Sequence, residues 1–101
     1  MTTINTTFHV EPSVDCEFRD WIKSRYIPYA VESAGLHSPL FMRIMTPMEG
    51  GTGYAVQLQA TDNNKVTSWL DIAQPVKLKE MATKWGEKVM FFTTLMEGIE
   101  L

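Results

Sequence analysis

The chain has 101 residues, of which 45% are hydrophobic and 21% charged, and its formal net charge at pH 7 is −3. This composition is typical of a globular protein, and its length predicts one domain over residues 1–101. The negative charge gives no electrostatic reason to bind nucleic acid or an anionic membrane, so we expect neither as a partner.

The cysteine count and the apolar runs favour a cytoplasmic location. The one cysteine, Cys16, excludes an intramolecular disulfide and fits a reducing compartment. The first residues do not follow the basic-then-apolar pattern of a secretory signal. No apolar run approaches the roughly 20 residues that span a bilayer, so we expect no membrane span.

The first predicted element is a strand over Thr2–Val10 whose two faces differ in chemistry. One face carries Ile4, Phe8 and Val10. The other face is polar yet uncharged and carries Thr3, Asn5, Thr7 and His9. An uncharged polar face is unusual for a strand that meets bulk water. We therefore expect the apolar face to pack on helices and the polar face to be covered by a second copy of the chain.

A first helix is predicted over Ser13–Ala34. Pro12 suits its first turn, where a missing N–H costs nothing, and Gly35 suits its end. Pro28 is expected to kink the helix or to end its first segment, because proline removes a backbone donor and crowds the preceding turn.

A second helix is predicted to begin at Asp62-Asn63-Asn64, to be interrupted at Gln74-Pro75 and to close at Gly86. In both helices the tryptophans fall on the apolar stripe, so we expect them in the core: Trp21, Trp69 and Trp85.

Three further strands are predicted, over Leu40–Thr46, Tyr54–Thr61 and Lys88–Met96. Pro47 is expected to end the first of these, and His37 to lie in an exposed loop before it. The segment 49–53, Glu-Gly-Gly-Thr-Gly, predicts a hairpin turn, because glycine tolerates the positive φ that such turns require. The last strand is apolar on both faces, which predicts cover on both.

The element order is β-α-β-β-α-β, which predicts an α+β, ferredoxin-like fold. Right-handed crossovers place the first and third strands in the middle of a four-stranded antiparallel sheet with both helices on one face. The expected helix-facing residues are Ile4, Phe8, Val10, Met42, Ile44, Tyr54, Val56 and Leu58. The expected open-face residues are Thr3, Asn5, Thr7, His9, Phe41, Arg43, Met45, Ala55, Gln57 and Gln59, joined by either Phe91 and Thr93 or Phe92 and Thr94.

An open face of this mixed chemistry is too apolar to be left in water and too polar for a dry core. Two such sheets closing on each other would form a dimeric α+β barrel with a partly hydrated interior. Apolar walls with a few convergent polar groups are also typical of a small-molecule site. Homodimerisation is the commonest way to cover an identical patch.

His9 has two interpretations. It can be a general base, a metal or haem ligand, or a hydrogen-bond donor to a ligand. It can also be a neutral histidine satisfied by Thr7, Gln57 or water, which is the interpretation we favour, because no second His, Cys or carboxylate shares its predicted face. Asn5 can orient a ligand oxygen or simply satisfy a buried neighbour.

Arg43 is the only charge on the predicted open face. Its guanidinium suits a carboxylate or phosphate, and it can equally pair with a carboxylate across the dimer. The candidate ligand-binding residues are Asn5, Thr7, His9, Arg43 and Gln57. No metal or cofactor motif is present, so we expect no metal and no cofactor.

Several segments resemble a family of short bacterial proteins catalogued only as a domain of unknown function. They are Asn5-Thr6-Thr7-Phe8-His9-Val10, Phe18-x-x-Trp21, Tyr26-Ile27-Pro28 and Gly86-Glu87-Lys88-Val89-Met90-Phe91-Phe92-Thr93-Thr94-Leu95-Met96-Glu97. The resemblance runs over nearly the whole chain. It implies a cytoplasmic bacterial protein of ferredoxin-like fold and brings no established activity.

The architecture is more loosely similar to the dimeric α+β barrel superfamily, which includes antibiotic-biosynthesis monooxygenases and haem-degrading enzymes. The resemblance implies a cavity surrounded in some members by Asn, Trp and His. Asn5 and His9 match the Asn and the His, whereas no Trp lies on a predicted strand.

Three hypotheses follow. The first is a homodimer that binds a small organic ligand between its sheets. The second is a structural dimer without a ligand, and the third is an oxygenase of the monooxygenase type with His9 and Asn5 at its centre. Whether the protein is an enzyme stays open at this point.

Overall fold

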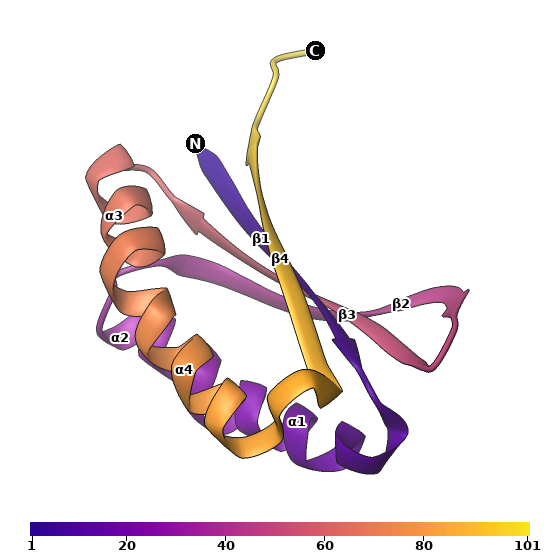
Figure 1. Ribbon diagram of the computed structural model, residues 1–101. Helices are drawn as coiled ribbons and strands as arrows, with labels where there is room; N and C mark the ends of the chain where they lie inside the picture. The colour runs from indigo at the N-terminus through magenta and orange to yellow at the C-terminus, as the bar shows by residue number, and fades with distance from the viewer.

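The computed structural model describes all of residues 1–101 and confirms the predicted element order. Four antiparallel strands form one sheet in the order β2-β3-β1-β4. The strands are β1 (Thr2–Val10), β2 (His37–Met48), β3 (Gly51–Ala60) and β4 (Val89–Glu97). All helices lie against one face of the sheet and leave the other face open (Figure 1). The chain therefore has the ferredoxin-like α+β fold.

The first helical region stays helical through Pro28. Its segments are η1 (Pro12–Val14), α1 (Asp15–Trp21), η2 (Ile22–Tyr26) and α2 (Ile27–Glu32). A proline inside an α-helix clashes with the carbonyl four residues earlier and leaves it unbonded. The segment η2 is a π-helix, and this wider turn directly before Pro28 provides the local adjustment that the ring requires.

The second helical region accommodates Pro75 in the same way, with a π-helical turn directly before it. Its segments are α3 (Asn63–Ser68), the π-helical η3 (Trp69–Ala73), α4 (Gln74–Trp85) and η4 (Gly86–Lys88). As predicted, Asp62 caps its start, since its Oδ1 accepts a 2.8 Å hydrogen bond from the backbone N–H of Asn64. Gly86 ends α4 with a φ of +55°, a conformation that favours glycine. No helix combines the length and the apolarity needed to cross a membrane.

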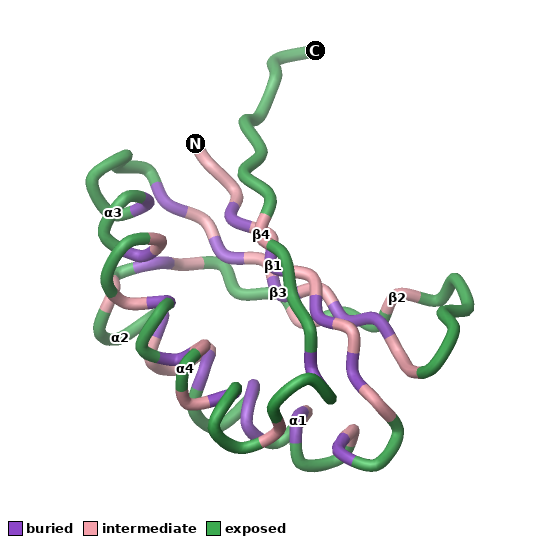
Figure 2. The backbone as a smooth tube through the Cα atoms, viewed as in Figure 1, coloured by how far each residue is buried: buried purple, intermediate pink, exposed green.

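The core lies between the helices and the sheet and is rich in aromatic rings. Figure 2 shows buried positions recurring along β1 and β3 and on the helix sides that meet them. The Phe18 ring is fully buried, with centroids 5.1 Å from Phe8 and 5.6 Å from Tyr54. Trp21 and Trp69 are buried, and Trp85 packs against the cluster, as the sequence predicted.

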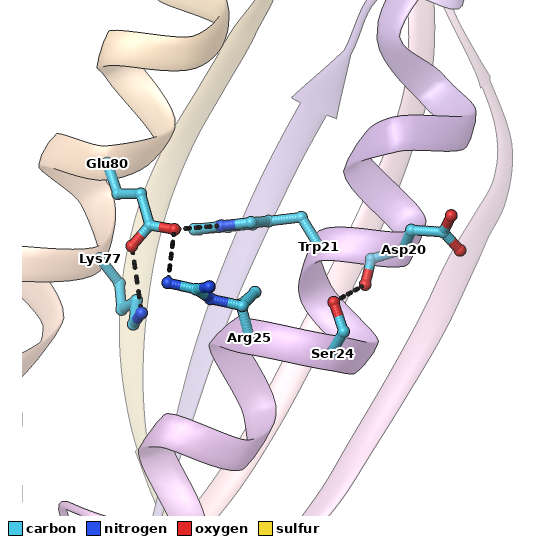
Figure 3. A network of polar contacts seen from close by, with 6 residues as sticks. All are labelled: Asp20, Trp21, Ser24, Arg25, Lys77 and Glu80. Atoms are coloured by element: carbon cyan, nitrogen blue, oxygen red, sulfur yellow. Dashed lines mark hydrogen bonds and ion pairs between the residues drawn. The ribbon is translucent and has the colours of Figure 1, made fainter.

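Glu80 links the two helical regions outside this core (Figure 3). Its carboxylate accepts a 3.0 Å hydrogen bond from the Trp21 indole N–H and lies 3.4 Å from Arg25 and 3.1 Å from Lys77. The Lys77 ammonium also lies 4.7 Å from the centre of the Tyr29 ring. One carboxylate on α4 thus contacts groups from α1, η2 and its own helix.

The predicted faces of β2 were wrong. Phe41 pairs with Val56 and Arg43 with Tyr54, so Phe41 and Arg43 lie on the helix side. Met42, paired with Ala55, lies on the open side. Leu40 pairs with Gln57 and Ile44 with Gly53, so both also lie on the open side, whereas Met45 falls in the irregular segment between Ile44 and Met48 and has no partner on β3. The reason is aromatic packing, because the Phe41 ring lies 5.4 Å from Tyr54 and 6.5 Å from Phe18.

The bounds of β2 also differ from the prediction. The strand begins at a half-buried His37, which is therefore not in an exposed loop, and it passes Pro47 to end at Met48. Pro47 is tolerated because β2 is an edge strand and the register shifts between Ile44 and Met48.

The β2–β3 turn lies close to the end of β1. A Cβ at Gly51 would lie 2.2 Å from the carbonyl oxygen of Val10, so the two backbones approach too closely for any side chain there. Gly50 adopts a φ of +79°, which glycine allows at no steric cost. These two glycines let the hairpin fold back beside β1.

Candidate functional site

The open face of the sheet carries a polar central band between two apolar edge strips. The polar central band consists of Thr3, Asn5, Thr7 and His9 on β1 and Gln57 and Gln59 on β3. The β2 strip consists of Leu40, Met42, Ile44 and Met48, and the β4 strip of Met90, Phe92 and Met96. Phe92 and Thr94, rather than Phe91 and Thr93, thus belong to the open face.

The apolar strips are exposed to an unusual degree. Met90 and Phe92 keep 63% and 61% of their surface accessible, and Leu40 and Met42 are also exposed. Single exposed apolar residues are ordinary, whereas two rows on one face are typical of a surface that another molecule covers.

Asn5 and Gln57 lie directly opposite each other at the centre of the band. The Asn5 side-chain N–H donates a 3.2 Å hydrogen bond to Thr7 Oγ1, and Gln57 makes no side-chain hydrogen bond within the chain. All three residues are half-buried. The Asn5 carbonyl and the Gln57 amide are therefore free to bind a group that approaches the open face.

The His9 side chain makes a hydrogen bond to the backbone of the β2–β3 turn. Its Nε2 lies 2.9 Å from the backbone carbonyl oxygen of Glu49. A carbonyl only accepts, so Nε2 carries the proton and donates it, and in the neutral ring Nδ1 is left as an acceptor. One ring nitrogen of His9 is thus satisfied within the chain, and its partner is Glu49 rather than the predicted Thr7, Gln57 or water.

A hollow of about 250 Å³ lies at the β4 end of the band. It is lined by Thr7, His9, Met48, Met90, Phe91 and Phe92. Two polar side chains on an apolar wall give a surface that can orient a small molecule by one or two hydrogen bonds.

Four of the five candidate residues share this face, and Arg43 does not. Asn5, Thr7, His9 and Gln57 lie together, whereas Arg43 lies on the helix side next to Tyr54. The predicted open-face position of Arg43 is corrected for the same reason as that of Phe41. Without Arg43, no charged side chain occupies the central band or the edge strips.

The structure also contains a buried polar cluster that the sequence reasoning missed. The Gln74 amide nitrogen lies 3.0 Å from both Thr6 Oγ1 and the Tyr26 hydroxyl and 3.3 Å from Thr93 Oγ1. Burial raises the pKa of Tyr26, while its hydrogen bonds to Gln74 and Thr6 act in the opposite direction. The available signal was Thr6, a polar residue in the apolar phase of β1.

The chain contains no cluster of potential metal-binding side chains. No three His, Cys, Asp or Glu side chains gather closely enough to hold a metal ion, and Cys16 is exposed and free.

Comparison with known proteins places the chain by family and by fold. A family model described as a domain of unknown function (DUF4286) matches residues 1–99. No curated protein matches the chain. A protein named as a candidate antibiotic biosynthesis monooxygenase from Deinococcus radiodurans has a similar structure, with a TM-score of 0.73 and 12% identity over 100% of this chain and 95% of its own.

A second similar structure is that of an ethyl tert-butyl ether d (EthD) family protein from Bacillus halodurans. Its TM-score is 0.67 and its identity 14%, over 98% of this chain and 100% of its own. At such identities the likeness shows the fold alone.

Proposed function

Since the chain belongs to the DUF4286 family, a domain of unknown function, we propose its function from its own geometry. It acts as a homodimer whose two open sheet faces enclose a small, uncharged organic ligand. The observation that carries this proposal is the polar central band between two exposed apolar strips.

A second copy of the chain is the occupant that best fits this surface. In a two-fold interface the same patch lies on both subunits, so apolar strips can meet apolar strips and the polar bands face each other. Such packing removes the exposed surface of residues such as Met90 and Phe92 from water. The polar bands then line a chamber between the sheets.

The extended C-terminal tail supports the same assembly. Residues 98–101 lie outside the sheet and project away from the body of the molecule (Figure 1). Their two apolar side chains, Ile99 and Leu101, are exposed. An apolar tail of this kind can pack on a partner subunit.

The ligand class follows from the groups that the chamber would present. Asn5, Thr7 and Gln57 offer neutral donors and acceptors, and the edge strips offer apolar and aromatic walls. A charged ligand would meet no counter-charge there. A neutral molecule with an amide, carbonyl or hydroxyl group on an apolar ring matches the site.

A second candidate function is a structural dimer without a ligand. The Asn5 side-chain N–H is bonded to Thr7 and the His9 Nε2 to Glu49, so these two groups are satisfied within the chain. This observation favours side chains and water as the contents of the chamber.

Light scattering of the purified protein tests the dimer. The wild type is expected to have twice the mass of the chain, and Phe92→Asp to be a monomer, because the interface would bury an unpaired charge. Val76→Asp is the matched control, since Val76 on α4 is 55% exposed and lies outside the open face. A monomeric wild type would rule the dimer out, and equal masses for both variants would rule out the open face as its interface.

A titration with benzamide, followed by amide NMR shifts, tests the ligand. Shifts confined to β1 and β3 that weaken in Gln57→Ala would support the chamber as a binding site. A dimer in which benzamide and a panel of neutral aromatic alcohols and lactones move no open-face amide would support the structural alternative.

A further inference from the structure

We propose that a second hollow, on the helix side of the β2 edge, binds a small aromatic carboxylate. Its aromatic and arginine side chains, Phe41, Tyr54 and Arg43, belong to the face of the sheet opposite the chamber, and Met42, at the β2 edge, is the one residue that lines both.

The hollow has a volume of about 290 Å³ and lies between the first helical region and strands β2 and β3. The helix contributes Arg19 and Lys23, and the strands contribute Phe41, Met42, Arg43 and Tyr54. Three of the nine lysines and arginines of the chain thus line one hollow, in a protein whose net charge is −3.

None of these three cations is neutralised by an ion pair. The ion pairs of the chain join Glu80 to Arg25 and to Lys77, and no carboxylate lies within 4.0 Å of Arg19, Lys23 or Arg43. Arg19 and Lys23 are four residues apart, so they lie on one side of the helix and repel each other. A bound anion would relieve this repulsion.

The one carboxylate that touches the wall is already engaged. Asp15 Oδ1 accepts a 2.6 Å hydrogen bond from the Tyr54 hydroxyl. Burial, and then the hydrogen bond to Asp15 and its charge, raise the pKa of Tyr54, whereas a hydrogen bond with Arg43 and the charge of Arg19 act in the opposite direction. The lining of the hollow has three cations and no carboxylate, so a ligand meets a positive surface.

The shape and walls select an aromatic carboxylate. The half-buried Phe41 ring lies 5.4 Å from the buried Tyr54 ring at an angle of 41°, so Phe41 provides the aromatic surface beside the cations. The volume is close to the lower end of the range for ligand pockets, about 300 Å³, which suits a single ring. The arginine fork binds a planar carboxylate through two parallel hydrogen bonds.

An NMR titration of the full chain with benzoate, benzamide and inorganic phosphate tests the proposal. Benzoate is expected to shift the amides of Arg19, Phe41 and Arg43, whereas benzamide and phosphate leave them in place. Arg43→Gln is expected to weaken benzoate binding by about tenfold, because a charge-assisted contact is lost. Lys79→Gln, which removes an exposed lysine outside the hollow, should leave it unchanged.

Three results would overturn the proposal. Equal binding of benzoate and benzamide would show that charge is not recognised, and equal binding of phosphate would show that the ring is not. Unchanged benzoate binding in a folded Arg43→Gln would remove the arginine from the site. Light scattering on the same samples separates these results from a failure of the dimer, because Arg43→Gln should not change the mass.

Discussion

The side-chain amide of Gln74 donates a 3.0 Å hydrogen bond to the hydroxyl of Tyr26. Tyr26 ends the π-helical segment η2, and Gln74 directly follows the π-helical segment η3. The two helical regions are thus joined beneath the sheet, next to Thr6 and Thr93, by a side chain that is only 4% exposed. Buried polar groups of this kind must be paired, so the contact orients both helices on the sheet.

Removal of the Gln74 amide should destabilise the fold. Gln74→Met keeps the side-chain length but removes the amide donor that the oxygens of Thr6, Tyr26 and Thr93 share. We expect a loss of about 1–3 kcal/mol in the free energy of unfolding, measured with urea at one protein concentration. The double variant with Tyr26→Phe should lose less than the sum of the single losses, because the two side chains share one contact. Additive losses would contradict the coupling.

Because Phe41 and Met42 lie on opposite faces of β2, we expect their replacement by alanine to differ in its effect on stability. Phe41→Ala should cost about 2 kcal/mol or more in the free energy of unfolding, because the ring packs on Phe18 and Tyr54. Met42→Ala should cost far less in a dilute sample, since its side chain is on the open face. Urea unfolding of both variants is the measurement. A larger loss for Met42→Ala would mean that the two faces are exchanged.

His9 is predicted to stabilise the turn that follows β2. His9→Ala removes the hydrogen bond to Glu49, and we expect a loss of about 0.5–1.5 kcal/mol. Hydrogen exchange should be faster at the amides of Gly50 and Gly51 than in the wild type. His37→Ala is the control, because that ring bonds only to its neighbour Ser38. If hydrogen exchange at Gly50 and Gly51 were unchanged in His9→Ala, His9 would not stabilise the turn.

The lowered pKa of Glu80 predicts that the protein loses stability in acid. The hydrogen bond from Trp21, followed by Lys77 and Arg25, lowers the pKa of Glu80 below its ordinary value of 4.5, although partial burial opposes this. A lowered pKa in the folded state means that the ion stabilises the fold above pH 4.5 and that this contribution disappears as the pH falls further.

The measurement is the melting temperature between pH 6 and pH 3. The wild type should lose more stability over this interval than Glu80→Gln, which cannot be protonated there. Glu87→Gln is the control, since Glu87 makes no ion pair. Identical slopes for the wild type and Glu80→Gln would disprove the assignment.

Local signals in the sequence were sufficient for much of the fold. The clean alternation of β1 and β3 placed Ile4, Phe8, Val56 and Leu58 on the helix side, because only one register buries all of them. Asp62 and Gly86 marked helix ends through chemistry that acts within a few residues. The open-face position of Asn5, Thr7, His9 and Gln57 followed from the same alternation.

The tertiary structure decided what local patterns leave undetermined. In β2 both alternating sets contain large apolar residues, so hydrophobicity alone did not identify the helix-facing set. The contacts of Phe41 with Phe18 and Tyr54 determine which face is buried. Three other features join residues that are distant in the chain. They are the proximity of Arg19 to Arg43, the hydrogen bond between Tyr26 and Gln74, and the hydrogen bond between His9 and Glu49. Such contacts depend on packing between elements, and a periodic pattern within one element carries no information about them.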